Sequence, residues 1–108
     1  MTTESLHTLE TWRTAIAREP LLMLFKHSPI CPVSARALRQ WQRFLATHPE
    51  VPTAFVDVIA DRAVARGLSE ESGVPHQSPQ AILFRAGKAA WNADHDDITA
   101  ESLAAAAR

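Results

Sequence analysis

The 108-residue sequence predicts an α/β fold with a four-stranded mixed sheet and helices on both faces. Three observations predict it. Two short strand-like runs flank a long amphipathic helical pattern, which is typical of a right-handed crossover between parallel strands. Two later runs, joined by a short turn that contains glycine, indicate an antiparallel hairpin. Helical patterns also precede the first run and follow the last one, so that helices are available to cover the sheet.

The first half of the chain supplies the parallel unit. Residues 8–19 carry apolar side chains at helical spacing and end before a proline, which predicts an amphipathic helix. The run 21–25 is apolar without alternation, which favours a strand that is buried on both faces and central in its sheet. Residues 32–47 begin with a proline, where a missing N–H costs nothing, and form the second helix. Residues 53–59 are rich in β-forming side chains and form the second parallel strand.

The second half supplies the hairpin. A third helix is expected over 61–72, followed by a loop with two prolines at 74–79. Residues 80–85 and 89–93 form the two hairpin strands, and an alanine-rich helix runs from its cap at Thr99 to the end of the sequence. This order of elements is the layout of the thioredoxin and glutaredoxin scaffold.

Composition narrows the class of protein. With 46% hydrophobic residues the chain has enough apolar material for one core, so we expect one domain over 1–108. The formal charge of -1 gives no reason to expect nucleic acid or a membrane as a partner. No apolar run approaches the roughly 20 residues that span a bilayer, and the N-terminus lacks the features of a signal peptide. We expect a cytoplasmic monomer.

The stretch 26–34 contains the single cysteine of the chain. Cys31 follows a buried strand and precedes a helix, and a helix N-terminus favours the thiolate, which is the nucleophilic form. Ser34 falls beside it on the first turn, within reach of a hydrogen bond to the sulfur. His27 is the better candidate for added positive charge, because Lys26 could point away along the strand.

The spacing Cys31-Pro32-Val33-Ser34 restricts the chemistry. Dithiol oxidoreductases carry a second cysteine where Ser34 stands, and a serine cannot close an internal disulfide. Cys31 is therefore limited to mixed disulfides, which a thiol from outside the chain must resolve. Ser78-Pro79 comes just before a strand, where thioredoxin-like proteins hold a cis proline that faces the cysteine.

A set of short motifs spread over nearly the whole chain matches one family. The motifs are His27-Ser28, Cys31-Pro32-Val33-Ser34, Val74-x-His76-x-Ser78-Pro79-Gln80, Gly87-Lys88, Trp91, His95 and Ile98-Thr99. In these the sequence resembles the monothiol bacilliredoxins, the YtxJ-like proteins of the bacillithiol system. Three positions differ from the family pattern, namely Ile30, Gln77 and Asp96.

The resemblance implies removal of bacillithiol from protein mixed disulfides. Cys31 would be the nucleophile with Ser34 as its catalytic partner. The residues expected to bind the substrate are Pro32, Ser78, Pro79 and His27. Bacillithiol would be a co-substrate rather than a bound cofactor, no metal is expected, and the partners would be bacillithiolated client proteins and a small thiol.

Two other functions fit the same residues. In an iron-sulfur carrier, Cys31 and a small thiol from each of two subunits would hold a shared cluster, although cluster-carrying relatives usually have glycine in place of Pro32. In a non-catalytic thioredoxin-like binding module, Cys31 would be dispensable and would alkylate no faster than free cysteine.

Overall fold

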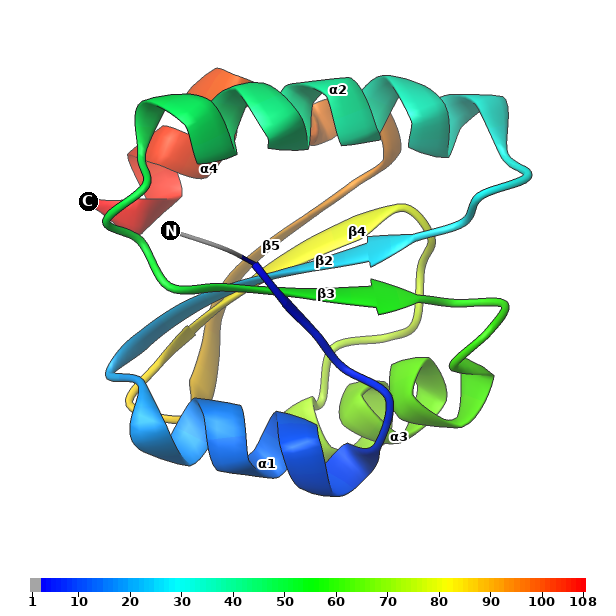
Figure 1. Ribbon diagram of the computed structural model, residues 1–108, viewed down its shortest axis with the longest axis vertical. Coiled ribbons are helices and arrows are strands. Elements are labelled where there is room, and N and C mark those ends of the chain that lie inside the picture. Colours follow the sequence, from blue (N-terminus) through cyan, green and yellow to red (C-terminus); the bar gives the residue numbers. More distant parts are fainter. Residues whose placement is uncertain (1–2) are drawn as a thin grey trace.

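The computed structural model describes residues 3–108, which form a central sheet between two layers of helices (Figure 1). Helices α1 and α3 cover one face of the sheet, and α2 and α4 cover the other. The strands are β1 (Glu4–Ser5), β2 (Leu21–His27), β3 (Thr53–Asp57), β4 (Gln80–Arg85) and β5 (Lys88–Asp94). The helices are α1 (Leu9–Arg18), α2 (Pro32–Thr47), α3 (Arg62–Ser72) and α4 (Ala100–Ala107), with a 3₁₀ turn at His95–Asp97.

The sheet has five strands in the order β1-β3-β2-β4-β5. The predicted parallel pair and antiparallel hairpin are both present, and β2 is central as expected. The prediction of four strands is wrong, because β1 adds a parallel partner to β3. An ion pair of 3.0 Å between Glu4 and Arg18 ties this strand to α1. A two-residue strand is too short to produce an alternating pattern in the sequence.

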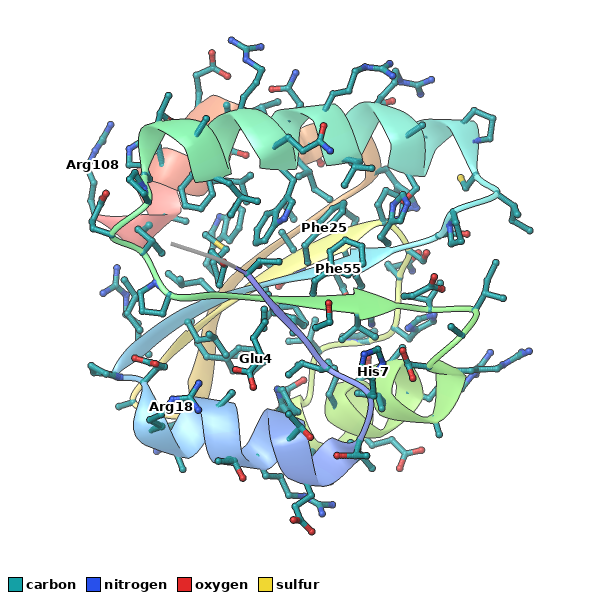
Figure 2. All side chains as sticks on the ribbon, in the orientation of Figure 1. Glu4, His7, Arg18, Phe25, Phe55 and Arg108 are labelled. Carbon is teal, nitrogen blue, oxygen red and sulfur yellow. The ribbon has the colours of Figure 1, made fainter. Side chains whose placement is uncertain are left out.

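Strand β2 separates two apolar cores. Leu22 and Leu24 face the core under α1 and α3, whereas Met23 and Phe25 face the core under α2 and α4. Figure 2 shows Phe25, together with its β3 partner Phe55, between the sheet and α2. Burial on both faces explains why the apolar run of β2 does not alternate. Within residues 3–108, no helix is both long and apolar enough to cross a membrane.

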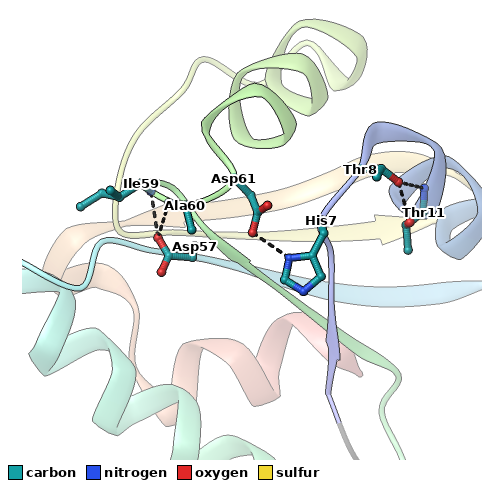
Figure 3. Close-up of polar contacts among 7 residues, drawn as sticks. All are labelled: His7, Thr8, Thr11, Asp57, Ile59, Ala60 and Asp61. Atoms are coloured by element: carbon teal, nitrogen blue, oxygen red, sulfur yellow. Dashed lines mark hydrogen bonds and ion pairs between the residues drawn. The ribbon is translucent and has the colours of Figure 1, made fainter.

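Local hydrogen bonds set the element boundaries. The side chain of Thr8 caps α1, which therefore begins at Leu9 rather than one residue earlier. Strand β3 ends at Asp57, two residues before the predicted end, because its carboxylate accepts hydrogen bonds from the backbone N–H groups of Ile59 and Ala60 (Figure 3). Helix α3 ends at Ser72 and is capped by Gly73, which adopts a left-handed conformation with φ of 79°.

The candidate site residues predicted from the sequence lie at one edge of the sheet. The parallel strands β2 and β3 both end there, and the antiparallel strand β4 begins there. We call this the site edge and define it as residues 27–34, 57–61 and 74–79. In Figure 1 it lies on the right, where the chain enters α2.

Candidate functional site

Cys31 is the N-cap residue of α2. Its backbone is extended, its carbonyl accepts the hydrogen bond of Ala35 N at 3.0 Å, and Pro32 takes the first helical position. The thiol makes no capping hydrogen bond and is partly exposed. The sulfur thus lies at the positive end of a 16-residue helix, close to N–H groups that no side chain satisfies. This arrangement leaves the sulfur accessible to a disulfide.

Ser34 is buried and bonds to the end of β2. Its Oγ lies 2.7 Å from His27 Nδ1 and accepts a hydrogen bond of 2.9 Å from the backbone N–H of Ser28. Among the described residues, its hydroxyl makes no hydrogen bond with the Cys31 sulfur, contrary to the expectation from their spacing. Ser34 instead ties the strand end to the first turn of α2, so it fixes the loop that carries the cysteine.

His27 lies on the α2 side of the sheet. Burial lowers the pKa of its ring below the ordinary value, although the negative charge of Asp57 opposes the change. The imidazole is therefore neutral at neutral pH and does not supply the positive charge that the sequence suggested. Its ring also stacks on Phe25, with ring centroids 5.9 Å apart. In the structure, the His27 ring is hydrogen-bonded to the hydroxyl of Ser34.

Lys26 points to the opposite side of the sheet and is fully buried. Its Nζ donates hydrogen bonds of 2.9 Å to Ser69 Oγ and to Gln80 Oε1. Burial lowers the pKa of Lys26 to about 8, while the negative charge of Asp94 opposes the change. A lysine that directly follows a run buried on both faces was the signal in the sequence for this buried polar cluster.

Gln80 connects Lys26 to the loop at 74–79 through hydrogen bonds. Its Nε2 donates hydrogen bonds to the carbonyl of Pro75 at 3.1 Å and to Asp94 Oδ1 at 2.9 Å. Since Lys26 and Gln80 are register partners between β2 and β4, the cluster holds the start of β4 against the end of β2. The buried ammonium therefore positions the loop that precedes β4.

The loop before β4 contains the expected cis bond between Ser78 and Pro79. Pro79 is buried, and its carbonyl accepts a hydrogen bond of 3.1 Å from His95 N. The register places Pro79 beside the end of β2, from which the chain leads to Cys31. Two buried polar atoms of this loop, Ser78 Oγ and His76 Nδ1, have no hydrogen-bond partner among residues 3–108.

Ile30 and Asp96 are two of the positions that differ from the family pattern. Ile30 is 83% exposed directly before Cys31. A second exposed isoleucine, Ile59, follows β3 and is 50% exposed. Asp96 forms a two-point ion pair with Arg36, in which both N–O distances are 3.1 Å. The pair lies on the surface of α2 just after its first turn. No local pattern predicts this pair, because Arg36 and Asp96 are far apart in the chain.

Among residues 3–108, no three His, Cys, Asp or Glu side chains are grouped so that they could hold a metal ion. A shared cluster would therefore need ligands from a second subunit and a small thiol in addition to Cys31.

Comparisons with known proteins identify the family. Residues 4–103 match the family model of the monothiol bacilliredoxin BrxC. The chain belongs to the monothiol bacilliredoxin family. It is 31% identical to a solved structure described as "A putative oxidoreductase with a thioredoxin fold", with a TM-score of 0.90 over 98% of this chain and 94% of that one.

More distant structures share the thioredoxin fold. Mitochondrial thioredoxin 3 from Saccharomyces cerevisiae is 15% identical, with a TM-score of 0.77 over 97% of this chain and 92% of that one. Oxidised thioredoxin from Plasmodium falciparum is 13% identical, with a TM-score of 0.77 over 99% of this chain and all of that one. The predicted thioredoxin-like fold is thus confirmed, and family and fold together give the chain a role in thiol-disulfide redox chemistry.

Proposed function

We propose that this chain is a monothiol oxidoreductase that removes bacillithiol from protein mixed disulfides through Cys31. One observation carries the proposal: the single cysteine of a bacilliredoxin-family chain is partly exposed at the N-cap of α2, and a cis proline precedes β4, the strand that pairs with β2. A serine at the position of a second cysteine leaves no internal thiol to compete for the mixed disulfide.

The proposed reaction has two steps, each an exchange of one disulfide for another. The Cys31 thiolate attacks the bacillithiol sulfur of the mixed disulfide, and a bond forms between these two sulfurs. The bond from bacillithiol to the client breaks, and the client leaves as a thiolate that takes a proton from water. An external thiol, such as free bacillithiol, then attacks the bacillithiol sulfur on Cys31. This step produces bacillithiol disulfide and restores the Cys31 thiolate.

Residues around Cys31 prepare it for this exchange. Pro32 takes the first position of the helix whose N-terminus carries the sulfur. Ser34 and His27 hold the loop that carries the thiolate. Ser78 and Pro79 form the proposed binding edge, where the backbone of Ser78 pairs with the client segment beside its disulfide. We assign binding to these residues and nucleophilic attack to Cys31.

Transfer of bacillithiol tests the proposal directly. A bacillithiolated client protein is incubated with the chain, and both are followed by intact-protein mass spectrometry. We expect the client to lose one bacillithiol and the chain to gain it, because Cys31 is its only thiol. No transfer, or equal loss from the client with Cys31→Ser, refutes the proposal. A parallel reaction with a glutathionylated client measures the preference for bacillithiol.

A further inference from the structure

A cavity lined by arginines opens at the site edge. It has a volume of about 240 Å³ between the loop after β3, the first turns of α3 and the loop at 74–79. Its lining residues are Val58, Ile59, Arg62, Ala65, Arg66 and His76. An adjoining cavity of about 410 Å³ shares Arg66 and His76 and extends along α3. We call the two together the basic pocket.

The arginines of the basic pocket have no carboxylate partner. Arg62 and Arg66 lie one helical turn apart on α3, and neither forms an ion pair with any residue in the described part of the chain. Two nearby acids, Asp57 at the end of β3 and Asp61 just before α3, are already engaged (Figure 3). Asp57 accepts hydrogen bonds from the loop backbone, and Asp61 pairs with His7 at 2.9 Å.

His76 shows that positive charge dominates the pocket. The pKa of its ring is lowered, first by burial and then by the positive charges of Lys26, Arg66 and Arg62. Its Nδ1 atom is buried without a hydrogen-bond partner. Glu70 lines the outer cavity and is the single carboxylate of the lining. An anion in the inner cavity would meet two unpaired guanidinium groups and no opposing carboxylate.

The pocket lies on the same sheet edge as the reactive sulfur. Its wall at Val58 is joined to the end of β2 by a backbone hydrogen bond of 2.9 Å from Val58 N to His27 O. The chain reaches Cys31 four residues after that carbonyl. Its other wall belongs to the loop that carries the cis bond before Pro79. The basic pocket therefore lies at the same end of the sheet as Cys31, on the side that α3 covers.

We propose that the basic pocket binds the carboxylate groups of the small thiol during transfer. The inference rests on the proposed function and specifies how the thiol is recognised. Bacillithiol joins its cysteine through a sugar to a malate group, which carries carboxylates away from the sulfur. Arg62 and Arg66 hold these carboxylates by paired N–H donors, and His76 adds a third polar contact.

A comparison of two disulfides tests the assignment. Bacillithiol disulfide carries carboxylates, whereas 2-hydroxyethyl disulfide is neutral, and the Cys31 thiolate displaces one thiolate from either. The double variant Arg62→Gln and Arg66→Gln should react at least about tenfold more slowly with bacillithiol disulfide and at an unchanged rate with the neutral one. The control variant Arg39→Gln and Arg43→Gln removes the same charge from α2 and should change neither rate.

A second comparison shows whether the pocket binds carboxylates of the small thiol or of the client. Acidic and neutral client peptides are each loaded with bacillithiol and offered to the same variants. An equal decrease in rate for both peptides supports recognition of the small thiol. A decrease confined to the acidic peptide overturns the inference, since the pocket would then bind the client.

A binding measurement keeps the inference distinct from the proposed function. Malate is titrated into the Cys31→Ser chain, and the nuclear magnetic resonance signals of Arg62, Arg66 and His76 are followed. Saturable shifts that disappear in the double arginine variant support a carboxylate site, even if Cys31 fails to react with bacillithiol disulfide and the proposed function is rejected. If no shifts appear, and the unaltered chain and the double arginine variant with Cys31 intact transfer bacillithiol at equal rates, the inference is overturned and the proposed function stands.

Discussion

The buried ammonium of Lys26 should make the protein more stable at alkaline pH than at neutral pH. Burial lowers the pKa of Lys26 from 10.5 to about 8. Below pH 8 the folded and unfolded chains both hold the proton. Between pH 8 and 10.5 the folded chain has released it while the unfolded chain still binds it, so the free energy of unfolding rises with pH. At about 1.36 kcal/mol per pH unit, this interval of about 2.5 units gives a gain of about 3 kcal/mol.

The assay is urea unfolding, followed by far-ultraviolet circular dichroism at neutral and alkaline pH. The Cys31→Ser chain is the reference, so that the chain contains no thiol. The chain contains no tyrosine, and its other lysine, Lys88, is exposed, so few groups interfere. We expect the reference chain to gain about 3 kcal/mol on going to high pH. Adding Lys26→Met should abolish most of that gain.

The matched control is Lys88→Met in the same background, which should keep the full increase because Lys88 is exposed in the folded chain. Equal pH dependence with and without Lys26→Met would refute the reasoning, as would a reference chain that loses stability on going to alkaline pH. At neutral pH, Lys26→Met should change the free energy of unfolding by less than the gain of about 3 kcal/mol expected at alkaline pH. Removing a buried charge stabilises the chain, but Gln80 Oε1 then loses its donor.

Three further changes test other parts of the structure. Ser34→Ala should lower the free energy of unfolding by about 1 to 3 kcal/mol, because two partners at the end of β2 lose their hydrogen bond; unchanged urea stability would contradict this. Gly73→Ala should cost about 1 kcal/mol from its left-handed backbone alone, and Gly73→Asn should cost less in the same assay. Asp96→Asn should free the Arg36 guanidinium to attract the Cys31 thiolate, so iodoacetamide should alkylate Cys31 faster at neutral pH, and a slower reaction would count against the ion pair.

The fold was predictable because each main element carries its own local signal. The apolar run of β2 lacks alternation since both of its faces are buried. Pro32 marks the start of α2, and Thr99 with its reciprocal partner Ser102 marks the start of α4. The cis bond before Pro79 was expected from its place before a strand, and that place depends on the order of elements rather than on any feature of the two residues.

The parts that were not predicted depend on contacts between distant segments. Strand β1 exists because β3 offers an open edge, which no pattern in two residues can reveal. The side of the sheet that Lys26 faces depends on strand register, and its partners come from α3 and β4. Ser34 was placed beside Cys31 by helical spacing, but its hydrogen bonds are determined by how closely the end of β2 approaches the helix.

The two cores on either side of β2 also separate the optical signals of the protein. Trp41 stacks on Phe25 with ring centroids 5.2 Å apart, and Phe25 stacks in turn on His27, which bonds to Ser34 at the site edge. Trp12 lies across the sheet against Phe84, in the other core. Of the three tryptophans, Trp41 is joined by aromatic contacts to the reactive loop, Trp91 also packs against the core under α2 and α4, and Trp12 is separated from both by the sheet. The protein carries its own reporter of events at the cysteine, with an internal reference on the opposite face.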